Sequence, residues 1–122
     1  MKIAIQLFGH IRTYKECVEN LKKYLSPKHD YDFFMHTWSK NEAETSSWHN
    51  EHIENIFDIN SLENELIELY DLKSLQIEEQ IYQNLGKVQT NEKFIDLFGI
   101  KCMFESMKKA NDLRIKHEEK NN

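Results

Sequence analysis

The chain has few of the residues that interrupt regular secondary structure: one proline and three glycines among 122 residues. All-β sandwiches and barrels need such turn residues between many short strands, so the composition favours a chain in which helices carry much of the fold. It also contains no apolar run approaching the roughly 18 residues of a membrane span, and no charged leader with a cleavage site. We therefore expect a cytoplasmic location and no transmembrane segment, and leave peripheral membrane association open.

Cysteine and positive charge are also scarce. Cys17 and Cys102 each fall on an apolar helical face, which favours buried thiols over a disulfide. The formal net charge is −5, which argues against the broad positive surface of nucleic-acid-binding proteins, so no nucleic-acid partner is expected. A length of 122 residues suits a single domain, residues 1–122, with one hydrophobic core.

The opening stretch, residues 2–12, reads KIAIQLFGHIR. Its near-continuous apolar run predicts a strand buried on both faces, as in parallel sheets, and Gly9 ends it. Thr13 and Glu16 form a capping box, and the apolar residues that follow keep helical spacing until Ser26 and Pro27. The order strand, glycine turn, helix is the place where α/β proteins commonly bind phosphate.

A second strand is predicted over residues 31–38, YDFFMHTW, which is rich in aromatic residues. Strand, helix and strand form a right-handed βαβ unit, so the two strands are parallel. Their carboxyl ends, at Gly9-His10 and at His36-Thr37-Trp38, must then lie on one edge of the sheet, where ligands bind in open α/β sheets. The fold class predicted is α/β, with a small, mostly parallel sheet ordered 3-2-1 between flanking helices.

The remaining pattern is weaker. Residues 39–50 read as a loop, residues 53–57 as a short helix, and residues 62–70 as a helix capped by Asn60 or Ser61. A third strand is predicted at residues 74–78. From about residue 91 to 119 a long helix is expected, with Gly99 as a kink or as its true start, and its Met and Phe stripe over residues 94–107 is predicted to be core.

The first candidate site is the turn after the first strand. Gly9 allows close approach of a phosphate, the amides around His10 and Thr13 point outward, and Arg12 offers a bidentate guanidinium. These four residues are the candidates for donor binding at this turn. The alternative is a tight strand-to-helix turn in which Arg12 is exposed or paired with an acid.

The second candidate site is the end of the second strand. His36 and Thr37 would line the same pocket, with Trp38 stacking on a base or a sugar. The alternative, equally weighted, is a strand end at which Trp38 covers the core.

Three further motifs favour ordinary structural roles. His49-x-x-His52 has helical spacing but no third metal ligand nearby, so a solvated helix start is the preferred interpretation. Glu78 and Glu79 follow the third strand, and solvation is favoured over contact with a ribose or a basic acceptor. The spacing reveals neither a Ser-His-acid triad nor a Cys-His pair that would identify a nucleophile. Catalytic residues therefore stay unassigned.

Taken together, KIAIQLFGHIRTY and DFFMHTW, with IEEQ at residues 77–80 and FESMKKANDLR at residues 104–114, resemble the N-terminal part of glycosyltransferase-like proteins from bacterial capsule and lipopolysaccharide loci. The resemblance implies the Rossmann-like front half of a GT-A-type domain. It also implies that the chain is the donor-binding N-terminal half of a nucleotide-sugar-dependent glycosyltransferase of surface polysaccharide biosynthesis, with a nucleotide sugar as its ligand.

In that family a further strand with an acidic Asp-x-Asp-like segment follows the helix that matches residues 104–114, and in GT-A enzymes such residues hold a divalent metal. This sequence stops before such a strand, so the expected domain is partial. Asp30-Tyr31-Asp32 precedes its strand and falls on the wrong edge. We thus expect no metal site within residues 1–122, and Mn²⁺ or Mg²⁺ only where a longer protein carries that segment.

The competing interpretation is a non-catalytic, truncated module that binds a nucleotide or a protein. Self-association through an uncovered sheet edge would belong to that interpretation.

Overall fold

The computed structural model describes residues 1–11, 14–39 and 58–121. Arg12 and Thr13, the loop and short helix predicted between residues 40 and 57, and with them His49 and His52, lie outside the described residues. The elements, in chain order, are β1 (Lys2–Gly9), α1 (Tyr14–Tyr24), β2 (Asp30–Trp38), α2 (Ile59–Tyr70), β3 (Leu72–Glu78), β4 (Lys87–Gln89), β5 (Phe94–Asp96) and α3 (Leu97–Asn121).

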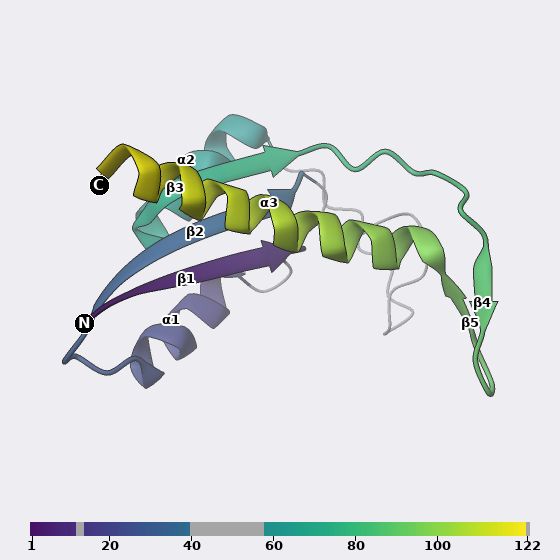
Figure 1. The fold of residues 1–122 in the computed structure, drawn as a ribbon, viewed down its shortest axis with the longest axis horizontal. Coiled ribbons are helices and arrows are strands. Elements are labelled where there is room, and N and C mark those ends of the chain that lie inside the picture. Colours follow the sequence, from purple (N-terminus) through teal and green to yellow (C-terminus); the bar gives the residue numbers. More distant parts are fainter. Residues whose placement is uncertain (12–13, 40–57, 122) are drawn as a thin grey trace.

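The main sheet has the strand order β1-β2-β3, and both strand pairs are parallel. Helices α1 and α2 lie on one face of this sheet and the long α3 crosses the other face (Figure 1). The three-layer α/β arrangement, the strand order and the third strand are therefore as predicted. Strands β4 and β5 form a separate antiparallel hairpin, which projects beyond the carboxyl edge of the main sheet (Figure 1).

The prediction of a first strand buried on both faces is wrong. Ala4 and Phe8 of β1 are exposed, and no residue of β1 is fully buried. The first buried residue of the chain is Ile11, in the turn that follows the strand. The fully covered strand is β2, in which residues 33–38 are all buried. The physical reason is position: β2 lies between two neighbours, whereas β1 is an edge strand among the described residues.

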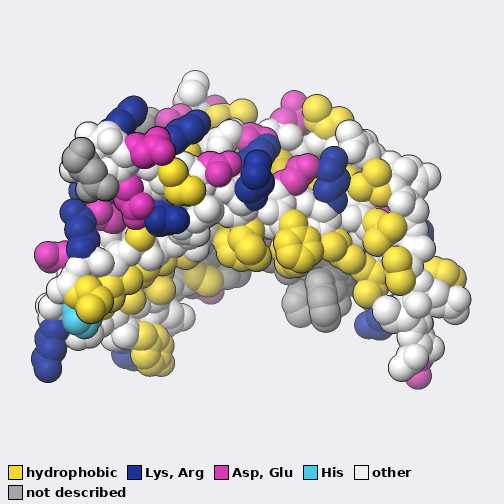
Figure 2. All heavy atoms as spheres, in the orientation of Figure 1, with side chains coloured by type: hydrophobic (Ala, Val, Ile, Leu, Met, Phe, Trp, Pro, Cys, Tyr) yellow, Lys and Arg dark blue, Asp and Glu magenta, His cyan; other side chains and the backbone are white. Residues whose placement is uncertain are grey.

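The long C-terminal helix begins later than predicted. Phe94 belongs to β5, and α3 starts at Leu97, with Gly99 in its first turn. Most of the Met and Phe stripe is not core: Phe94 is 68% exposed and Phe104 is 58% exposed, although Phe98 is buried as predicted. The first turns of α3 extend past the ends of the sheet strands, and hydrophobic side chains gather along their concave side (Figure 2). These exposed side chains lie on a different side of α3 from Phe98 and Cys102, which pack against Trp38 of β2.

Two smaller predictions also need correction. The N-cap position of α2 is occupied by Asp58 rather than by Asn60 or Ser61; the Asp58 side chain accepts from the Ser61 hydroxyl at 3.0 Å and not from a backbone N–H of the helix. The predicted cap residues instead occupy the first turn, because the helix starts at Ile59, two or three residues earlier than predicted. Cys102 is buried as expected, but Cys17 is exposed on α1, since α1 buries mainly the side of the helix that carries Val18.

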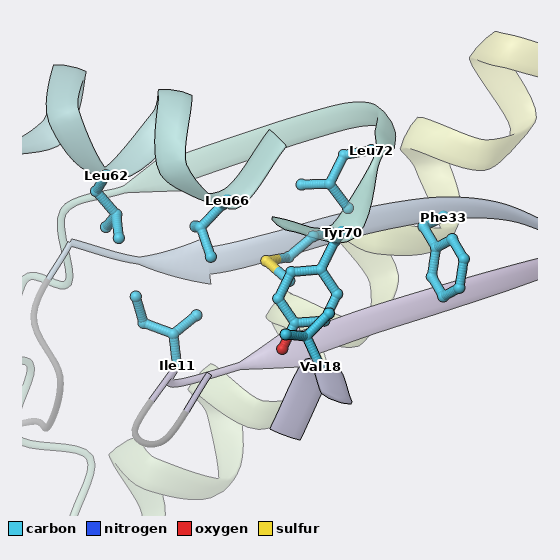
Figure 3. Packing of buried hydrophobic residues seen from close by; sticks show 8 residues of the cluster. Ile11, Val18, Phe33, Leu62, Leu66, Tyr70 and Leu72 are labelled. Carbon is cyan, nitrogen blue, oxygen red and sulfur yellow. The ribbon is translucent and has the colours of Figure 1, made fainter. Parts of the chain in front are cut away.

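The main hydrophobic core fills the space between the sheet and the α1–α2 layer. In Figure 3 side chains from α1, α2, β2, β3 and the turn after β1 point toward one another. Leu66 of α2, at its centre, is fully buried. The two helices are also joined by a hydrogen bond from the Tyr70 hydroxyl to the Tyr14 carbonyl, 2.8 Å long. This core fixes the sheet and, with it, the positions of the strand ends.

Candidate functional site

The carboxyl ends of β1 and β2 lie side by side, as the βαβ argument predicts. Gly9 is the register partner of Thr37, and one step later along the sheet Trp38 is the partner of Glu78 on β3. The third strand thus brings an acidic residue to the same edge. The candidate site is built on these adjacent strand ends.

Gly9 takes a left-handed backbone conformation, with φ of 97°, which glycine adopts readily and other residues rarely. Both of its peptide groups are held. The Gly9 N–H donates to Ser106 Oγ of α3 at 2.8 Å, and the Gly9 carbonyl accepts from the Thr37 hydroxyl at 2.7 Å. The strand end is therefore clamped from both sides just before the chain turns toward α1.

His36 lies beneath this clamp and is fully buried. Its Nδ1 is 2.6 Å from Ser106 Oγ, and its Nε2 is 3.5 Å from Glu78 Oε1. The Ser106 hydroxyl has two acceptors within reach, His36 Nδ1 at 2.6 Å and the His36 carbonyl at 3.3 Å, and we assign its proton to the nearer Nδ1. The ring proton then sits on Nε2, toward the Glu78 carboxylate. We assign this tautomer because the opposite one would leave a bare Nε2 lone pair facing a negative charge.

Glu78 is the last member of the polar series that runs from Gly9 through Ser106 and His36. Its Oε2 forms an ion pair with Lys109 of α3 at 2.5 Å, and its Oε1 accepts from the Gln76 amide. Burial lowers the pKa of His36; the nearby Glu78 raises it and Lys109 lowers it, with burial the largest of the three. The imidazole is therefore neutral at physiological pH, in agreement with the hydrogen-bond assignment.

Trp38 belongs to a small second core with Phe98 and Cys102 of α3. Its ring meets the His36 ring edge-on, at 4.9 Å between centroids and an interplanar angle of 87°. The Lys109 ammonium lies 5.9 Å from the Trp38 ring centroid. Burial also raises the pKa of the Cys102 thiol, so this thiol is protonated and has no nucleophilic character.

Ser106, His36 and Glu78 share the residue types of a hydrolase triad, but their surroundings do not fit that role. Ser106 and His36 are both 0% exposed, so no substrate carbonyl reaches the hydroxyl. The Ser106 oxygen is also occupied by the Gly9 N–H. A nucleophile needs access and an open attack direction. The arrangement serves instead to fix α3 and the Gly9 turn on the sheet.

Of the seven residues predicted for donor binding, the structure describes five. Gly9, His36, Thr37 and Trp38 lie together at the carboxyl edge, with the last three buried. His10 is half-buried at the start of the turn. Ile11, next to it, is anchored in the main core, and its carbonyl accepts from the Tyr14 N–H at 3.1 Å. Arg12 and Thr13 lie between these anchors, outside the described residues.

Ser106 and Lys109 were not among the sequence candidates, and Glu78 was interpreted as solvated. A signal was present: Ser106 and Lys109 are three residues apart on one side of a helix, and Ser106 and Ala110 are small residues on its buried face. The positions in β2 and β3 that face α3 include His36, Gln76 and Glu78. A small, polar helix face against polar strand positions indicates a hydrogen-bonded layer.

The acidic pair Asp30 and Asp32 lies at the opposite, amino edge of the sheet, as predicted, but it belongs to β2, which begins at Asp30, rather than preceding the strand. Asp32 pairs there with Lys2 at 3.3 Å and approaches His117 Nε2 at 3.9 Å. Within residues 1–11, 14–39 and 58–121, no group of three or more His, Cys, Asp or Glu side chains is placed to hold a metal ion.

In the part of the chain that the structure describes, no helix combines the length and the apolar character needed to cross a bilayer. Comparison of the chain with protein-family models, with curated proteins and with solved structures found no match.

Proposed function

We propose that this chain is the donor-binding part of a nucleotide-sugar-dependent glycosyltransferase that acts in surface polysaccharide assembly in the cytoplasm. The observation that carries the proposal is the clamped, left-handed Gly9 turn at the carboxyl edge of a parallel sheet. Such an edge is where open α/β folds hold nucleotides. The resemblance of residues 2–14 and 32–38 to capsule and lipopolysaccharide glycosyltransferases supplies the class of ligand.

The buried residues would then position the site rather than touch the donor. Thr37 and Ser106 hold the Gly9 peptide groups, and His36 holds Ser106. Gly9 is held through both of its peptide groups and Ile11 is anchored in the main core, so the peptide groups of residues 9–11 are held in place at this turn. In this proposal the diphosphate of the donor lies on that turn, with His10 and Arg12 as its side-chain contacts and Thr13 at the helix start.

The proposal is tested by thermal unfolding in the presence of UDP, GDP, CMP and their sugars, with and without Mn²⁺. A ligand at 100 times its Kd stabilises the native state by about 2.7 kcal/mol, which is several degrees in Tm for a small domain. We expect one nucleotide class to give this shift and Arg12→Ala to abolish it. The matched control is Lys23→Ala, which removes a basic side chain at the far end of α1.

No shift with any nucleotide, or an equal shift in wild type and Arg12→Ala, would contradict the proposed site. Release of free nucleotide from the sugar that gives the shift would extend the result from binding to transferase chemistry. The second candidate function is a non-catalytic nucleotide-binding or interaction module. It is favoured by one specific observation, the exposed apolar side of α3.

A further inference from the structure

Large hydrophobic side chains are exposed at several places, among them Met1, Tyr24 and Ile67, but four of them lie together on α3. These four occupy positions i, i+3, i+4 and i+7, which form one side of a helix. We call this set the apolar stripe: Ile100, Met103, Phe104 and Met107. Phe8, at the end of β1, is exposed as well, and the β4–β5 hairpin adds an apolar arm: Val88, Phe94 and Ile95.

The stripe and the arm form one surface. Hydrophobic side chains run along the concave side of α3 and continue onto the projecting hairpin (Figure 2). An apolar surface of this size on a monomer marks a site of association. Eight side chains of on the order of 150 Å² each, about half exposed, offer on the order of 600 Å². That is the lower end of what each partner contributes to a stable interface.

Charge distinguishes among the candidate partners. The stripe itself carries no ionisable side chain, and the charges beside it on α3 occur as opposed pairs, Lys101 with Glu105 at 3.4 Å and Lys108 with Asp112 at 3.9 Å. The surface therefore offers no field of one sign to select an acidic or a basic partner. It fits a partner whose own face is equally neutral and apolar.

The spacing of the stripe makes it complementary to itself. A second copy, rotated about a two-fold axis between Met103 and Phe104, runs its α3 antiparallel to the first. Met103 of one copy then meets Phe104 of the other, and Ile100 meets Met107. A two-fold interface requires this property, because the same patch must fit both sides. We propose that the apolar stripe is a homodimer interface in which two α3 helices pack antiparallel, with the hairpin arms at its margins.

The test is the molar mass in solution, by light scattering and sedimentation, over micromolar to millimolar concentrations of the whole chain. We expect wild type to dimerise and Met107→Glu or Phe104→Glu to weaken the dimer at least about 30-fold, the effect of losing one hot-spot contact. The control is Ile67→Glu on α2, which has the same 40% exposure as Met107 and lies outside the surface. It should dimerise like wild type.

Circular dichroism and Tm at low concentration report whether each variant still folds. A wild-type chain that stays monomeric throughout would overturn the proposal, and so would a dimer that survives both stripe variants or is lost equally in Ile67→Glu. The outcome does not depend on nucleotide binding, because the stripe variants leave the Gly9 turn unchanged. A partner protein that binds the stripe of a monomeric chain would replace the second copy as the occupant.

Discussion

At the scale of single residues, buried polar side chains at the carboxyl edge of the sheet hold the Gly9 turn in place. Thr37, His36 and Ser106 are all buried, and each is hydrogen-bonded to the Gly9 turn or to a residue that holds it. Buried hydroxyl and imidazole groups are costly unless they are paired. Their pairing therefore makes the position of the Gly9 turn part of the folded state.

Gly9→Ala should lower the free energy of unfolding by about 1–2 kcal/mol, because an L-residue is strained at a φ of 97°. The loss is conformational rather than steric, since no atom lies within 4 Å of the added Cβ. Urea denaturation measures it. Gly99→Ala is the matched control: its Cβ is equally uncrowded, but Gly99 is helical, so alanine should stabilise by up to about 1 kcal/mol. Equal effects at both positions would refute this account of Gly9.

His36 should make stability fall in mild acid. Burial lowers its folded pKa, so the unfolded chain binds the proton more readily. This stabilising contribution is complete above the unfolded pKa of about 6.5 and is lost as pH falls below it. Uptake of one proton on unfolding changes the free energy of unfolding by at most about 1.4 kcal/mol per pH unit.

The measurement is urea denaturation of wild type and His36→Gln at several pH values from neutral to mildly acidic. The two proteins differ only at position 36, so the difference between the two curves reports on the loss of the His36 imidazole. We expect wild type to lose more stability than His36→Gln below the unfolded pKa. Parallel curves would show that His36 does not titrate on unfolding.

At the scale of elements, the two faces of the sheet are covered by different physical means. The α1–α2 face is an apolar core centred on Leu66. The α3 face is mixed: Trp38, Phe98 and Cys102 form a small apolar cluster, and along the rest of the helix Gln6 donates to Asn111 at 2.9 Å and Ser106 and Lys109 bond to strand residues. Hydrophobic burial is the larger source of stability, whereas directional hydrogen bonds fix where α3 lies along the strands.

Leu66→Ala should therefore destabilise the protein by about 2–5 kcal/mol, because it leaves a cavity in the core at a fully buried position. Its neighbour on α2 provides the control. Ile67 is 40% exposed, so Ile67→Ala should change the free energy of unfolding by much less. Chemical denaturation of both variants tests the assignment, and comparable losses would mean that the core is not centred where the structure has it.

At the scale of the whole molecule, stability is concentrated in the sheet and diminishes toward the hairpin. Strand β2 has six consecutive buried residues, 33–38, whereas β4 has none and pairs over three residues with β5. The hydrogen bonds between short, exposed strands open locally at a low cost in free energy, whereas those of buried central strands open only when the whole domain unfolds.

Amide hydrogen exchange should accordingly be slowest in β2 and fastest in β4 and β5, with α3 protected most strongly around Ser106 and Ala110, which are fully buried. Mass spectrometry of labelled peptides at low protein concentration makes the comparison. Protection of the hairpin equal to that of β2 would contradict this distribution of stability.

The sequence alone was sufficient for the α/β class, the parallel βαβ unit, the strand order and the meeting of Gly9 with Thr37. These follow from local rules: apolar runs and helical spacing identify elements, and the right-handed crossover fixes their direction. The same rules placed the third strand near residues 74–78 and the acidic pair Asp30 and Asp32 at the opposite edge.

Tertiary structure decided which apolar stripe is covered and which polar residue is buried. Helical periodicity places Phe98 and Phe104 on different sides of α3, but only the tertiary packing determines that the side carrying Phe98 is covered by Trp38 and Tyr82 while Phe104 is exposed. Likewise, Glu78 meets His36 across the paired strands β2 and β3, and it meets Lys109 because α3 crosses the strand ends. Burial depends on such long-range contacts, whereas the sequence pattern reports only on neighbours along the chain.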